Sequence, residues 1–175
     1  MANTYTLISR NVLSSSAASV TFSAIPSTYT DLVVRFSTRS SSSLGVYDQI
    51  KLTFNGDTAT NYSDTYVFST PPSGTGISGA DVSSSFSMLL YSNGDTATAS
   101  TFGQGELYVP SYTSSTRKPS SSFSVAETNA TNTRLGINAN LWQGTAAITS
   151  ITLTSLTGAN FLAGSSFYLY GIKNS

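Results

Sequence analysis

Short runs of alternating apolar and polar residues recur about ten times along this chain, each ending near Gly, Ser, Asn or Pro. In the run 48–54 (DQIKLTF), Ile50, Leu52 and Phe54 alternate with polar side chains. Successive side chains of a strand point to opposite faces, so such a run is typical of a half-buried strand. No comparable helical pattern is present. The sequence therefore predicts one all-β domain over residues 1–175, an antiparallel β-sandwich with a jelly-roll-like arrangement of about ten strands.

The same alternation predicts which side chains form the core. In the strand expected over 135–141, Leu135, Ile137, Ala139 and Leu141 form the inward row. The phenylalanines expected to point inward are Phe22, Phe36, Phe54, Phe86 and Phe123. Segments 70–79 and 111–122 are rich in Ser, Pro or Gly, and we expect both to be exposed loops suited to contacting partners.

Composition excludes several classes of function. The chain has no His and no Cys, so it cannot form a Ser-His-Asp or Cys-His catalytic group, a disulfide or a cysteine-ligated zinc site. Eight basic residues balance eight acidic ones, and nucleic acid is not an expected partner because phosphate binding needs clustered positive charge. The start shows no secretory signal, and no long apolar run predicts a membrane span. We expect a product of the bacterial cytoplasm.

Few residues remain that suit catalysis or metal binding. Glu106 falls on the outward face of its expected strand, where a carboxylate is most often a solvated surface group. The sequence NGDTAT occurs twice, at 55–60 and 93–98, and is explained either as a turn or as a calcium loop built on Asp57 or Asp95. Each copy offers one carboxylate, whereas calcium takes six to eight oxygen ligands, so the turn is favoured. We expect no catalytic residue, metal or cofactor.

Five residues are candidates for binding a partner. Trp142 falls on the face of Asn138 and Asn140, outside the predicted inward row. It is explained as a strand-end side chain covering the core, as an anchor of a protein interface, or as a stacking surface for sugar. Arg117 and Lys118 lie in the predicted loop 111–122 and contact an acidic partner or only solvent. The candidates are Trp142, Asn140, Tyr112, Arg117 and Lys118.

Four segments in order resemble a family of tailed-bacteriophage virion proteins. Its pattern has a "sIPxTYTDL" strand entry, an "FNGDTxxNYS" turn, an "AITSITL" strand and a terminal "LYGI". The corresponding segments here are AIPSTYTDL, FNGDTATNYS, AAITSITL and YLYGI. The resemblance covers most of the chain and carries over no catalytic residue.

The resemblance implies a structural component of a phage particle. The first expectation is a decoration, or cement, protein that binds the major capsid protein on the capsid exterior as a homotrimer and stabilises the shell. The alternative is a tail or fibre module that binds host-surface carbohydrate. A third hypothesis, a polysaccharide-degrading enzyme, is disfavoured because the chain shows no catalytic constellation.

Overall fold

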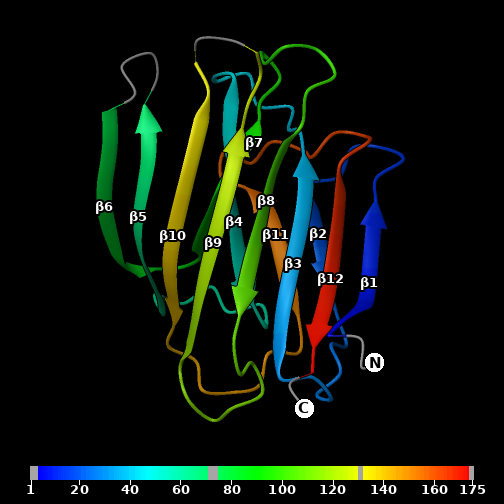
Figure 1. Ribbon diagram of the computed structural model, residues 1–175, viewed down its shortest axis with the longest axis vertical. Helices are drawn as coiled ribbons and strands as arrows, with labels where there is room; N and C mark the ends of the chain where they lie inside the picture. The colour runs from blue at the N-terminus through cyan, green and yellow to red at the C-terminus, as the bar shows by residue number, and fades with distance from the viewer. Residues whose placement is uncertain (1–3, 71–74, 130–131, 174–175) are drawn as a thin grey trace.

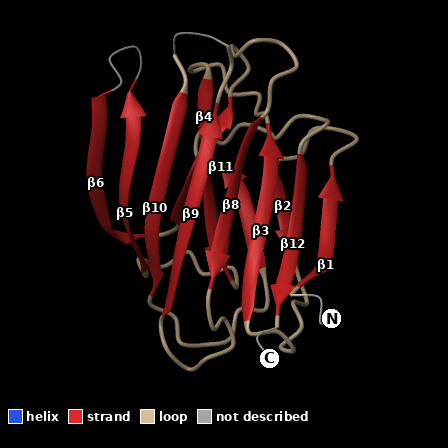
Figure 2. Cartoon of the chain, in the orientation of Figure 1, coloured by secondary structure: helices blue, strands red, loops and turns tan. Residues whose placement is uncertain are grey.

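The computed structural model describes residues 4–70, 75–129 and 132–173, and these residues form strands and loops (Figures 1 and 2). No helix among them is long and apolar enough to cross a membrane. The strands of the described residues are β1 (Tyr5–Val12), β2 (Ser19–Phe22), β3 (Asp31–Thr38), β4 (Tyr47–Phe54), β5 (Tyr62–Thr70), β6 (Thr75–Ser84), β7 (Ser87–Asn93), β8 (Gly103–Val109), β9 (Lys118–Ala126), β10 (Arg134–Trp142), β11 (Ile151–Ser155) and β12 (Ser166–Ile172).

The strands form two antiparallel sheets of unequal size that pack face to face. The large sheet has eight strands in the order β1-β12-β3-β8-β9-β10-β5-β6, and the small sheet has four in the order β2-β11-β4-β7. Figure 1 shows the large sheet in front and the small sheet behind it, with both chain ends at the same end of the sandwich. The all-β sandwich is thus confirmed, with more strands than expected, and the jelly-roll arrangement stays a prediction.

The main core lies between the small sheet and the half of the large sheet nearest β3. Ile50, Leu52 and Phe54 of β4 are fully buried there, as the alternation predicted. From the large sheet, β3, β8 and β12 contribute a matching set of buried side chains: Leu32, Val34, Phe36, Leu107, Val109, Phe167 and Leu169. Of the phenylalanines predicted to be core, Phe22, Phe36 and Phe54 are buried, whereas Phe86 is only half-buried.

Strands β9 and β10 have the opposite orientation to the prediction. Leu135 and Ile137 face outward, as does Phe123 on the neighbouring strand, while Asn138 and Asn140 are buried. The reason lies at the end of β10, where the Trp142 ring packs 5.6 Å from that of Phe54 in the core. Because side chains alternate strictly along a strand, burying Trp142 turns both asparagines inward and the aliphatic row outward.

Two predicted loops are partly strand. Residues 75–79 of the expected loop 70–79 belong to β6, and 71–74 lie outside the described residues. The expected loop 111–122 ends at residue 117, because β9 begins at Lys118. The sequence does not predict the start of this strand because its inward positions are polar. Ser120, Ser122 and Ser124 occupy positions where a half-buried strand usually has apolar side chains.

The first NGDTAT copy is a turn that also holds Trp142. Asp57 Oδ2 accepts hydrogen bonds from Trp142 Nε1 at 2.7 Å and from the Asn61 side-chain amide at 3.0 Å. The hydrogen bond from Trp142, and then that from Asn61, lower the pKa of the Asp57 carboxyl. Asn55 and Gly56 both have positive φ, as the turn requires. The Asp57 carboxylate therefore binds the Trp142 indole, which supports the prediction of a turn over that of a calcium loop.

The second NGDTAT copy is organised by Arg39, which is 8% exposed. Its guanidinium donates to the backbone carbonyls of Asp95 and Ala97 at 2.8 and 2.9 Å, and to those of Thr98 and Thr101 at 2.8 and 3.1 Å. A charged donor thus holds the loop through its carbonyl oxygens. The two copies share a sequence but are stabilised by different long-range contacts.

Candidate functional site: the outer face of the large sheet

The five residues predicted to bind a partner do not form a surface. Trp142 and Asn140 are each 4% exposed, and Tyr112 and Lys118 are fully buried. Only Arg117 is exposed. For the other four, the expectation of accessible side chains is wrong, because each is turned toward the interior of the sandwich.

Lys118 and Tyr112 make hydrogen bonds that hold segment 111–117 in place. Lys118 Nζ donates to the carbonyl oxygens of Ser114, Thr116 and Thr145, and burial lowers its pKa. The Tyr112 hydroxyl donates to the carbonyl oxygen of Pro26. Both side chains therefore anchor segment 111–117 to the body of the protein.

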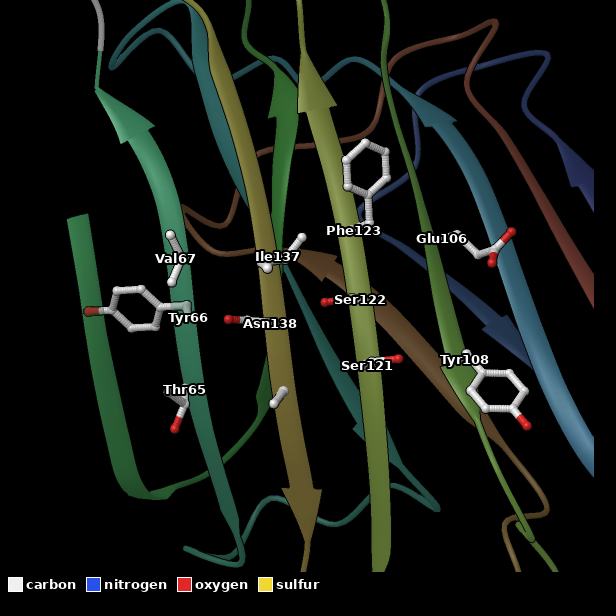
Figure 3. A pocket seen from close by; sticks show the side chains of 11 residues that line it. Thr65, Tyr66, Val67, Glu106, Tyr108, Ser121, Ser122, Phe123, Ile137 and Asn138 are labelled. Carbon is white, nitrogen blue, oxygen red and sulfur yellow. The ribbon is translucent and has the colours of Figure 1, made fainter. Parts of the chain in front are cut away.

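An apolar patch lies instead on the outer face of β5, β10 and β9. We define the patch as Val67, Phe123, Leu135 and Ile137, which are 48%, 44%, 48% and 56% exposed. Ile137 is the direct partner of Val67 on one side and of Phe123 on the other, so three side chains form one row across three strands. Figure 3 shows these three side chains on the adjacent strands β5, β10 and β9.

The patch borders a hollow of about 440 Å³ on the same face. Small or polar side chains floor it beside the patch, among them Thr65, Ser121 and Ala139. Glu106 and Tyr108 of β8 form its opposite side (Figure 3). A second hollow of about 280 Å³ adjoins Leu135 and Gly76 and shares Val67, Phe123 and Ile137 with the first. The outer face thus offers one continuous surface with an apolar centre.

The other half of the outer face is aromatic and carries an ion pair. Arg35 Nε donates to Glu106 Oε2 at 2.7 Å, and this bond raises the pKa of the guanidinium. The Arg35 guanidinium lies 5.5 Å from the ring centroid of Tyr5 and 5.8 Å from that of Tyr170. Tyr168 and Tyr170 stack with centroids 6.4 Å apart. The outward position predicted for Glu106 is confirmed.

This arrangement is suited to non-covalent binding. The Glu106 carboxylate is held by Arg35, and the neighbouring polar groups are hydroxyls and amides with no unusual nucleophile. Across residues 4–70, 75–129 and 132–173, no group of three or more His, Cys, Asp or Glu side chains gathers to hold a metal. A surface with an apolar centre, an ion pair and tyrosines at one side resembles the composition of protein interfaces.

Comparison with known proteins gives only distant structural likeness. No protein-family model matches the chain, and no curated protein matches it. Among solved structures, scytalido-glutamic peptidase in complex with a transition state analog inhibitor is similar at 10% sequence identity and a TM-score of 0.26. The match covers 91% of this chain and 66% of the peptidase. A likeness this weak identifies neither a family nor an activity.

Proposed function

We propose that this protein is a phage virion structural component, a decoration protein that binds the outside of the capsid shell through the outer face of its large sheet. One observation carries the docking part of the proposal. β9 and β10 direct Phe123, Leu135 and Ile137 to solvent, whereas the inward positions between them hold serines and asparagines. Contiguous exposed apolar patches on soluble proteins mark interaction sites. The phage setting rests on the sequence resemblance.

The chemistry of the face defines the partner that fits it. The patch itself carries no charge, and the nearest charges, Arg35 and Glu106, neutralise each other. The complementary surface is therefore apolar and uncharged at its centre with hydroxyl and amide groups around it. We assign this surface to the major capsid protein. Each patch side chain is about half-exposed, so covering it contributes on the order of 1 kcal/mol, and the four together a few kcal/mol.

Self-association as a homotrimer is the second part of the proposal, and the sheet edges support it. β6 is an edge strand of ten residues whose side chains are almost all exposed, including Ile77 and Val82 at 43% and 78%. Asp81 is the one charged residue on it, and it has no Lys or Pro. Long edges without such residues are templates for pairing with a second chain.

The alternative function is the binding of host carbohydrate by a tail module, through residues other than Trp142. Trp142 is buried, but Tyr168 and Tyr170 form a stacked pair on the outer face beside Tyr5. Partly exposed tyrosines of this kind can stack on sugar rings. We therefore place this candidate function on the tyrosine half of the face and rank it second.

The composition of purified particles tests the proposal. We expect quantitative mass spectrometry to find on the order of hundreds of copies per particle, as a shell component repeated by symmetry requires. Particles lacking the protein should assemble but lose their DNA at a lower temperature. A handful of copies per particle would favour the tail alternative, and depleted particles of normal heat stability would contradict a cementing role.

A further inference from the structure

Four polar side chains line up across the inward face of the large sheet. Ser120 of β9 is directly opposite Asn140 of β10, Asn140 is opposite Asp64 of β5, and Asp64 is opposite Asp81 of β6. Figure 1 shows these four strands side by side at one end of the large sheet. Direct cross-strand neighbours have Cβ atoms about 4.5–5.5 Å apart, so the side chains form a single group.

Most polar atoms of this row are buried and have no partner. Ser120, Asn140 and Asp64 are 7%, 4% and 5% exposed. Ser120 Oγ, Asp64 Oδ2 and both amide atoms of Asn140 make no hydrogen bond. In the adjacent row, Ser122 Oγ and Asn138 Oδ1 are likewise unpartnered. Buried polar groups in folded proteins are almost always satisfied, and a cluster of orphans therefore indicates a bound ion or water between them.

The charge of the row distinguishes an ion from water alone. Asp64 lies against Asp81, and the one salt bridge found among the described residues is elsewhere, between Arg35 and Glu106. Burial first, and then the charge of Asp81, raise the pKa of the Asp64 carboxyl from 3.8 to about 6. Asp64 is therefore a buried acidic side chain directly beside a second acidic side chain. A cation between them removes both the repulsion and the desolvation cost.

We propose that Asp64 and Asp81 bind a hydrated divalent cation, Ca²⁺ or Mg²⁺, with Asn140 Oδ1 as a further ligand. Carboxylate and amide oxygens are the ligands that these hard cations prefer, and bound waters complete the shell and reach Ser120. Asp81 also lines a cavity of about 270 Å³, together with Tyr66, Phe68, Met88 and Gln49. The site is independent of capsid docking, and it is separate from both NGDTAT turns.

Thermal unfolding of the full chain at neutral pH tests the site. We expect CaCl₂ or MgCl₂, added to chelator-treated protein, to raise Tm by about 5 °C or more at saturation, relative to NaCl of equal ionic strength. Asp64→Asn should abolish the rise, and Asp81→Asn should reduce it. Asp95→Asn, which removes an exposed carboxylate from the second turn, is the matched control and should respond as the native chain does.

No cation-dependent rise in the native chain, or an equal rise in Asp64→Asn, overturns the proposal.

Discussion

Replacing Arg39 by alanine is expected to lower the free energy of unfolding by about 3–5 kcal/mol, because hydrogen bonds from a charged donor contribute about 1.5–3 kcal/mol each and do not add fully. The guanidinium is buried and donates to four backbone carbonyls of the second NGDTAT loop. Alanine removes these charged hydrogen bonds together with the aliphatic stem of a buried side chain. Urea unfolding followed by tryptophan fluorescence measures the change, since Trp142 lies in the main core.

Two further variants make the Arg39 prediction specific. Arg39→Lys keeps the charge, but a single ammonium has three donors and lacks the planar fork, so we expect an intermediate loss. Arg117→Ala removes an exposed arginine and should change stability by no more than about 0.5 kcal/mol. A free energy of unfolding for Arg39→Ala within about 1 kcal/mol of that of the native chain would show that the loop does not depend on the guanidinium.

Replacing Ile137 by aspartate is expected to weaken binding to particles by about 30-fold or more, the loss of about 2 kcal/mol that defines an interface hot spot. Ile137 is the centre of the apolar patch, with Val67 and Phe123 as its direct neighbours. In the interface a carboxylate there would be desolvated against apolar atoms with no partner. Co-sedimentation of purified protein with particles that lack it gives the dissociation constants.

The stability of the isolated variant separates a binding defect from a folding defect. Ile137 is 56% exposed, so its replacement should leave Tm close to that of the native chain. Leu44→Asp is the matched control, because Leu44 is 83% exposed and lies outside the patch. It should bind particles normally. Equal binding by both aspartate variants would show that the patch is not the docking surface.

Alternation in the sequence identifies strands well but does not determine which face is buried. β4 and β10 show the same pattern, yet the apolar row of β4 is fully buried and that of β10 is half-exposed. The difference arises from tertiary structure: β10 lies in the large sheet, and Trp142 fixes its orientation against Phe54. Trp142 shares a face with Asn138 and Asn140, and that position was the available signal that the asparagine face is inward.

The candidate site was missed for the same reason. Phe123 and Ile137 were predicted to be core, so the surface that they form was not predicted.

The polar row of Ser120, Asn140 and Asp64 joins three strands through cross-strand pairing. A single sequence does not give the strand register, so it does not predict that these residues lie together. The turn at Asp57, by contrast, is local and was predicted correctly from its residue types.

Accessibility of position 137 in the particle tests the docking account most directly. The chain has no cysteine, so Ile137→Cys creates a single thiol whose reaction with a maleimide reports exposure. We predict rapid labelling of the isolated protein and labelling at least roughly tenfold slower in intact particles, as burial in an interface requires, while Leu44→Cys reacts equally in both. Labelling of Ile137→Cys at the same rate in particles as in free protein would contradict the account.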